Sequence, residues 1–526
     1  MRPPKGWLMM NDSANSYYAN CRWADAGRNA SGFYSTNNQP LQYSPHGYPV
    51  GTAIAARSNL WLLGCPAGDY NVNWQGNATI NISGSGGVAW KRIDANHGTL
   101  TLPAPCKMAQ TQWGPSPNEM SYIDVSSSDP ANPLDALHIW LPGYGPGTRH
   151  AGQIFHDQHL AIVRKFSGVR CMNSLNVASG HEENWAERVT MDMWDWSTKA
   201  VPIEADIELA REARLKRLWV NIPIKANDDY IRNSARLYHD KLHGVELIVE
   251  LGNENWNWGG GFIGWPTVHN IANNVKPEAF DGAIVAGKLV PDDHDSDGKP
   301  ILVTDEYVRS VRCTAERARE VAMIFQDVYR DRPRELLNIF CGCSADPRWI
   351  TLGLEFLTAK YGGQPFQLIG IAPYVDFWAN NGQYCKPTGP NGTYVLADLF
   401  TACDAYLSDT NQPGIPWQLA QHQALAQQYG VRLVDYEGGQ HFFPQDKPYT
   451  GKDLSTQAQT DPRMGAMYDK YFATLHKYGV AMHCDFVPIG EPWNQSGYWA
   501  ALQDYADTGP TNYRWAALLR ESAKSN

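Results

Sequence analysis

Between about residue 150 and the C-terminus, the chain alternates continuous apolar runs with amphipathic segments. Apolar runs such as residues 166–173, 245–254 and 431–439 have the length of buried strands, and each ends in a polar or aromatic cluster. Intervening segments such as residues 313–331 place their apolar residues at helical spacing. Because continuous apolar strands that alternate with helices are typical of parallel sheets, this part predicts a parallel sheet covered by helices.

Seven strand runs follow residue 150, at residues 166–173, 217–223, 245–254, 336–342, 367–374, 431–439 and 479–488. A closed (β/α)₈ barrel needs an eighth strand, which residues 6–12 supply most simply and residues 137–143 alternatively. An open doubly wound sheet is the competing architecture, but no dinucleotide-type glycine fingerprint follows a strand. We therefore predict an α/β fold of the (β/α)₈ TIM-barrel type.

Residues 46–148 show a different pattern. Short alternating runs such as residues 69–74 and 98–104 are separated by Gly, Asn, Ser and Pro, which is typical of an antiparallel β-sandwich. The chain is therefore expected to comprise an N-terminal segment, a β-sandwich-like domain or insertion, and a barrel, at residues 1–45, 46–148 and 149–526. The N-terminal segment can supply the first barrel strand.

Composition and charge narrow the choice of partners. The net charge is −10 and no Lys/Arg run is long enough to follow a phosphate backbone, so nucleic acid is a poor candidate. No apolar stretch reaches the ~20 residues of a membrane span. The 20 Trp and 26 Tyr suit surfaces that are partly apolar and partly wet, such as the faces of sugar rings, although large proteins also carry many core aromatics.

Two strands end in a glutamate flanked by Gly or Asn. In VELIVELGNE the alternation leaves Glu254 at the C-terminal tip, and in VRLVDYEGG it brings Glu437 to the same level. Functional groups of a (β/α)₈ barrel lie at this end of the strands, so both carboxyl groups would face one mouth. Cleavage of a glycosidic bond needs such a pair: one carboxyl donates a proton to the leaving oxygen, and one carboxylate attacks the anomeric carbon.

The GNE and YEGG motifs resemble clan A of the retaining glycoside hydrolases. That clan places its acid/base after an Asn at the end of strand four and its nucleophile at the end of strand seven. With residues 166–173 as strand two, Glu254 ends strand four and Glu437 ends strand seven. The resemblance covers about residues 150–510. The whole chain, with an all-β part near its N-terminus, also resembles bacterial proteins labelled cellulose-binding or cellulase-like.

The resemblance implies roles for further residues. Asn253 would bind the sugar 2-hydroxyl, Arg170 would orient the nucleophile, and Tyr374 would donate a hydrogen bond to it. Trp493 or Trp499 would form the platform under the reacting sugar. Positions that could contact the substrate elsewhere are Trp256, Trp258, Trp378 and His441. The chain departs from the clan pattern at Asn255, where many members have Pro, and at residues 223–228, where many have a histidine.

Metal chemistry is expected to have no part in the reaction. No H-E-x-x-H motif or zinc-type cysteine spacing occurs in the chain. Asp293, Asp295 and Asp297 match the first half of a calcium loop, but loop position 12 is Thr304 and not the usual Glu. A solvated acidic turn is therefore favoured over a structural calcium site, and no cofactor is expected to be required.

Two functions remain open at this point. The first is a retaining glycoside hydrolase that cleaves β-glycosidic bonds of a polysaccharide, of the β-glucan or cellulose type or xylan, by double displacement. The second is a non-catalytic carbohydrate-binding protein on a degenerate barrel. A polysaccharide substrate implies a secreted or periplasmic protein, although residues 1–12 lack the apolar stretch of a signal peptide. Ten cysteines allow one or two disulfides that the sequence does not pair.

Overall fold

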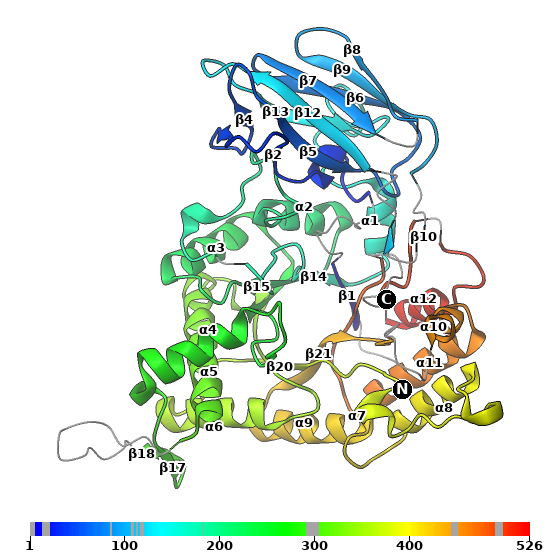
Figure 1. The fold of residues 1–526 in the computed structure, drawn as a ribbon. Coiled ribbons are helices and arrows are strands. Elements are labelled where there is room, and N and C mark those ends of the chain that lie inside the picture. The colour runs from blue at the N-terminus through cyan, green and yellow to red at the C-terminus, as the bar shows by residue number, and fades with distance from the viewer. Residues whose placement is uncertain are drawn as a thin grey trace.

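The computed structural model describes residues 6–12, 21–84, 87–106, 110–111, 114–115, 120–180, 182–290, 304–442, 451–489, 498–505 and 507–525. Eight parallel strands form a closed barrel in the order β1-β14-β15-β16-β19-β20-β21-β22 (Figure 1). These strands are β1 (Leu8–Asn11), β14 (Gly168–Arg170), β15 (Arg217–Ile222), β16 (Glu246–Leu251), β19 (Leu336–Cys341), β20 (Leu368–Ile371), β21 (Arg432–Gly438) and β22 (His483–Asp485). The predicted (β/α)₈ barrel is therefore confirmed.

The N-terminal strand closes the barrel. β1 pairs with β14 through Met10 and Val169, and with β22 through Leu8 and His483. Side chains from alternate positions of the strands fill the barrel interior, among them those of Met9, Trp219, Ile248, Leu337, Leu368, Val434 and Met482. The barrel is thus a packed core whose polar groups gather at its ends.

Helices surround the strands in the expected alternation (Figure 1). They are α1 (Asp157–Val163), α2 (Ile203–Ala213), α3 (Asp228–Lys241), α4 (Gly264–Asn270), α5 (Glu306–Val328), α6 (Arg348–Tyr361), α7 (Ala379–Gly382), α8 (Leu396–Tyr406), α9 (Ile415–Tyr429), α10 (Gly451–Gln459), α11 (Pro462–Lys477) and α12 (Tyr513–Ser525). Local sequence sets several of their ends. The side chains of Asn227 and Asp305 cap α3 and α5, while Gly362 and Gly430 end α6 and α9 in the left-handed conformation. No described helix is long and apolar enough to cross a membrane.

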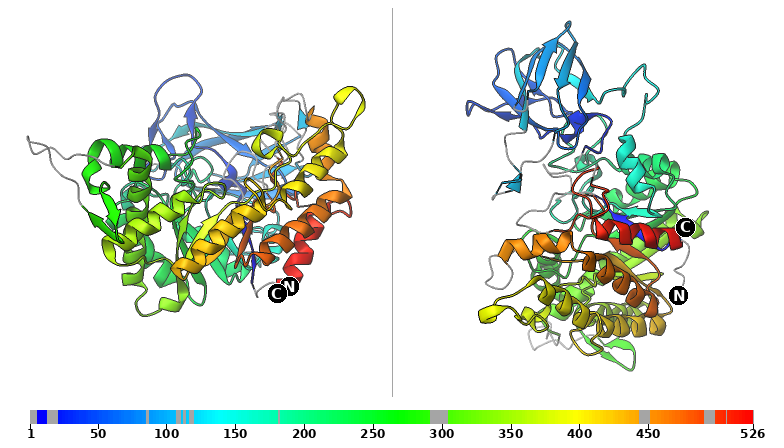
Figure 2. Two further views of the ribbon diagram at one scale, coloured as in Figure 1. Left: turned by 90° about the horizontal axis from the view of Figure 1, so that it is seen from below. Right: turned by 90° about the vertical axis from the view of Figure 1, so that its right-hand side faces the viewer.

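Two four-stranded antiparallel sheets form the sandwich. One is β2 (Tyr34–Ser35), β5 (Ala56–Trp61), β12 (Met120–Ser128) and β7 (Ala78–Gly84), and the other is β13 (Asp135–Trp140), β6 (Gly68–Gln75), β9 (His97–Leu102) and β8 (Ala89–Arg92). The alternative assignment of residues 137–143 to the barrel is therefore wrong, because they belong to β13 and the turn after it. In Figure 1 the sandwich lies above α1 and α2, and the right-hand view of Figure 2 also places it on one side of the barrel.

The sandwich core begins before residue 46, where the sequence pattern placed its boundary. A disulfide joins Cys21 to Cys65, and Phe33 is buried in the same core. This early segment has few alternating runs because it packs through a short 3₁₀ turn and isolated bridges. Trp194, which follows β14 in the chain, also enters the sandwich core, stacks on Phe33 and donates its Nε1–H to the carbonyl of Ser31 at 2.9 Å.

Replacing Trp194 by Ala should therefore destabilise the sandwich by ~3–5 kcal/mol, through loss of a fully buried ring that joins the two parts of the chain. Trp258→Ala provides the matched control, because that side chain is 73% exposed and should cost about 1 kcal/mol or less. Chemical denaturation of both variants measures the difference. Equal losses of unfolding free energy would contradict the assigned role of Trp194.

Candidate active site

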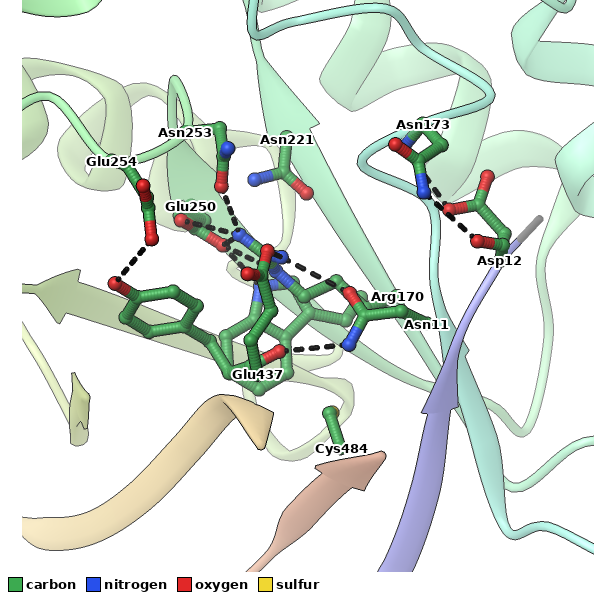
Figure 3. A network of polar contacts seen from close by, with 12 residues as sticks. Asn11, Asp12, Arg170, Asn173, Asn221, Glu250, Asn253, Glu254, Glu437 and Cys484 are labelled. Atoms are coloured by element: carbon green, nitrogen blue, oxygen red, sulfur yellow. Dashed lines mark hydrogen bonds and ion pairs between the residues drawn. The ribbon is translucent and has the colours of Figure 1, made fainter. Parts of the chain in front are cut away.

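Arg170 is the centre of the polar cluster at the C-terminal end of the barrel (Figure 3). It is the last residue of β14 and is fully buried. Its five N–H donors all meet acceptors: Nε and Nη2 donate to Glu250, Nη1 to Asn11 and Glu437, and Nη2 also to Asn253. Because a guanidinium has five donors, this hydrogen-bonding capacity is used completely and the ring of acceptors fixes its plane.

Glu437 lies in β21 and is 5% exposed. Its Oε1 accepts from Arg170 Nη1 at 2.7 Å, and its Oε2 accepts from the hydroxyl of Tyr374 at 3.0 Å. Burial raises the pKa of Glu437, and the charge and hydrogen bond of Arg170, followed by the bond of Tyr374, oppose that rise. Both oxygens are thus held by donors that favour the ionised form.

Glu254 lies on the turn that follows β16, in a backbone conformation that few side chains adopt. Its φ is +46° and that of Gly252 is +63°. Asn255 closes the turn: its Nδ2 donates to the carbonyl of Leu251 at 2.8 Å, and a Cβ on Gly252 would lie 2.2 Å from its Oδ1. The side chain of Asn255 therefore has a structural use at the position where many clan A members carry Pro. Left-handed residues of this kind occur often at functional sites.

Glu254 has different surroundings from those of Glu437. It is partly exposed, and its oxygens accept from Asn257 Nδ2 at 2.7 Å and from the hydroxyl of Tyr436 at 3.4 Å. Burial, followed by the negative charge of Glu437, raises the pKa of Glu254 to about 7. The two carboxyl groups interact electrostatically, and Glu254 is suited to keep its proton near neutral pH.

Two residues of this cluster, Asn11 and Glu250, were not predicted from the sequence. Asn11 accepts from Arg170 at 3.1 Å and donates to the carbonyl of Tyr436 at 3.0 Å. Glu250 is 2% exposed and accepts two N–H groups of Arg170 and the indole N–H of Trp219. An available signal was strand alternation, because Glu250 shares the inward face of its strand with Ile248, and a charge there requires a partner.

Aromatic rings gather beside Tyr374. His441 lies 5.2 Å from the Tyr374 ring and 5.8 Å from that of Trp499, and Phe486 packs against both Tyr374 and Trp499. Burial lowers the pKa of His441 to about 4, so its ring is neutral at ordinary pH. The structure therefore brings the predicted residues Tyr374, His441 and Trp499 together near Glu437.

A groove lies beside the segment that follows Glu254. Its volume is about 780 Å³ and its aromatic lining comprises Trp256, Trp258, Trp265, Tyr307 and Trp349. Trp256 donates its indole N–H to the Tyr436 hydroxyl at 3.3 Å, which joins the groove to the surroundings of Glu254. The rings of Trp258 and Trp265 are stacked, 5.5 Å apart. Trp265, Tyr307 and Trp349 carry no clear signal in the sequence, since each lies within or beside a helix.

Of the remaining predicted residues, Trp378 is described and the others are not. Trp378 packs against Tyr394 and over Gly382, within the segment that follows β20. Trp493, and the proposed calcium ligands Asp293, Asp295 and Asp297, fall outside the described residues. Among the residues that are described, no group of three or more His, Cys, Asp or Glu side chains is placed to hold a metal ion.

No family model matches the chain. No curated protein matches it either. Solved structures that match include glycoside hydrolases, the group that the sequence resembles. They include a CBM22-1–GH10 xylanase 10B of Clostridium thermocellum complexed with xylohexaose (10% identity, 96% of this chain and 97% of that chain, TM-score 0.40). A Thermotoga maritima β-glucosidase in complex with glucoimidazole matches at 12% identity, over 70% of this chain and 86% of that one (TM-score 0.35). A GH5-4 broad specificity endoglucanase of Clostridium longisporum matches at 11% identity, over 69% and 98% (TM-score 0.33).

Proposed function

We propose that this chain is a retaining glycoside hydrolase in which Glu437 is the nucleophile and Glu254 the acid/base. The observation that carries the proposal is that two interacting carboxyl groups at one barrel mouth have different hydrogen-bond donors. Arg170 and Tyr374 donate to Glu437 and oppose the rise of its pKa on burial, whereas Glu254 accepts from Asn257 and Tyr436 and its pKa is raised to about 7. A pair of carboxyl groups whose surroundings separate their proton affinities is the usual basis for separate acid and nucleophile roles.

The reaction follows from these surroundings. Glu437 attacks the anomeric carbon while Glu254 gives its proton to the leaving oxygen, so the glycosidic bond breaks as the glycosyl–enzyme bond forms. Glu254, now ionised, then takes a proton from water, which attacks the anomeric carbon and releases Glu437. Arg170 stabilises the carboxylate of Glu437 before attack and after release. The return of the proton to Glu254 restores the starting state.

The proposed substrate is a β-linked polysaccharide of the glucan, cellulose or xylan type, cleaved within the chain. The groove supports this choice because Trp256 links it through the Tyr436 hydroxyl to the proton donor, and because its aromatic rings suit the apolar faces of sugars. Since the acid/base protonates the leaving oxygen, a groove on its side would hold the leaving part of the chain. A secreted or periplasmic location fits such a substrate and belongs to the same proposal.

The pair can be tested with two alanine variants. Glu437→Ala should lower turnover by ~10³-fold or more on every substrate, because the covalent step is lost. Glu254→Ala should lose ~10²–10⁴-fold on polysaccharide but retain cleavage of dinitrophenyl glycosides, whose leaving group needs no proton. Equal losses on both substrates would exclude Glu254 as the acid. A wild type that binds polysaccharide but cleaves nothing would instead favour the carbohydrate-binding alternative.

The pH profile tests the charge state of Glu254. Its pKa of about 7 means that the proton donor is lost as the pH rises through that value, so kcat/KM for polysaccharide should fall above pH ~7. The fall should be much weaker for dinitrophenyl glycosides. The measurement is kcat/KM from pH 4 to 9 for both substrates. Profiles that fall together would show that another group governs the alkaline limb.

Substitution of Trp258 tests whether the groove binds the leaving part of the substrate. Trp258→Ala should lower kcat/KM for polysaccharide by ~10-fold, as expected for loss of about 1–1.5 kcal/mol of ring contact. The value for a dinitrophenyl glycoside should change less than about twofold, because a small leaving group forms few contacts along the groove. Tyr43→Ala is the control, since that exposed ring lies on the sandwich side of the chain. Equal losses on both substrates would place Trp258 outside a leaving-group site.

A further inference from the structure

Glu250 is a buried acid that takes no step in the proposed reaction. It lies in β16, four residues before Glu254, with 2% of its surface exposed. Its Oε2 accepts from Arg170 Nε and from Trp219 Nε1, both at 2.9 Å, and its Oε1 accepts from Arg170 Nη2 at 2.9 Å. Figure 3 shows Glu250 and Glu437 beside the guanidinium, with Glu254 set apart from it. Three N–H donors thus hold the carboxylate in one orientation.

The division of the Arg170 donors gives this contact a consequence for Glu437. Glu250 receives two N–H groups as a bidentate pair, whereas Glu437 receives one, from Nη1. A bidentate pair with arginine is a strong interaction that also fixes the relative orientation of the two groups. Without Glu250, the guanidinium could turn toward Glu437, and its whole positive charge would act there.

Charge balance leads to the same conclusion. One guanidinium lies between two buried carboxylates, so the pair of Arg170 and Glu250 is nearly neutral as seen from Glu437. We propose that Glu250 is a positioning residue, which fixes the plane of Arg170 and neutralises its charge so that Glu437 is oriented and remains a strong nucleophile. This inference rests on the proposed function, because it takes Glu437 as the group that attacks.

Other groups around Glu437 do not replace this effect. Those that interact with it electrostatically are Arg170, Glu250, Glu254, Tyr374, Tyr436, Cys341 and Cys484. Burial raises the pKa of the tyrosines and cysteines in this set, so these groups are neutral at ordinary pH. The negative charge of Glu250 is one of the causes that raise the pKa of Glu437, against the effect of Arg170.

Two substitutions separate charge from orientation. Glu250→Gln keeps the size and one acceptor oxygen but removes the charge, so the acid limb of the kcat/KM profile should move to lower pH by about one unit. Glu250→Asp keeps the charge, so its acid limb should stay within about 0.3 unit of wild type. Its shorter side chain reaches Arg170 less well, so kcat should fall ~10-fold with little change in KM. The proposal would be overturned if the acid limb of the kcat/KM profile does not move in Glu250→Gln, or if it moves equally in both variants.

A titration that does not depend on activity separates this inference from the proposed function. The full chain is labelled with ¹³C at glutamate carboxyl carbons, and the Glu437 signal is identified by its loss in Glu437→Gln. Its midpoint should lie lower in Glu250→Gln than in wild type, and an unchanged midpoint overturns the role of Glu250 even if the wild type cleaves glycosides. A shifted midpoint in a protein without glycosidase activity would support the effect of Glu250 on Glu437 and would reject the proposed glycoside hydrolase function. If Glu250→Gln does not fold, Glu250→Asp carries the test: wild-type kcat in that variant overturns the positioning role.

Discussion

The guanidinium of Arg170 joins four strands of the barrel through five hydrogen bonds. Its partners lie in β1, in β16 and the turn after it, and in β21, so one side chain ties the first half of the barrel to the second. Burying a charge costs several kcal/mol unless partners compensate it, and here two carboxylates and two amide oxygens do so. The mouth of the barrel can therefore keep its acidic groups in fixed positions only while this arginine is in place.

Near Arg170, Glu437 and Glu254 have different surroundings because one lies in a strand and the other on a turn. Glu437 belongs to a strand and faces the arginine directly. Glu254 stands on a left-handed turn that Gly252 permits and Asn255 closes, and its carboxyl accepts hydrogen bonds from Asn257 and Tyr436. Two chemically identical groups thus have different surroundings: Arg170 supports the carboxylate of Glu437, whereas burial and the negative charge of Glu437 raise the pKa of Glu254.

Other segments of the chain add aromatic side chains around the two glutamates and connect the sandwich to the barrel. Segments after β16 and β19 supply the aromatic groove beside Glu254, and the ring of Tyr374 packs with His441 and Phe486 beside Glu437. The sandwich is joined to the barrel by Trp194, whose ring fills the sandwich core although its sequence position follows β14. Long connections after parallel strands can therefore serve both the site and the contact between domains.

Strand alternation and strand order determined much of this protein in advance. Continuous apolar runs predicted the barrel, and the positions of Glu254 and Glu437 at strand ends predicted that they share one mouth. Alternation was also an available signal for Glu250, which was missed, but it could not have shown which distant side chain meets it inside the barrel. The Glu250–Arg170 pair, the link through Asn11, the groove of helix-borne rings and the early start of the sandwich depended on tertiary structure. The physical reason is that a local pattern defines the face on which a residue lies, whereas its partner is set by the closure of a barrel over more than 400 residues, from β1 to β22.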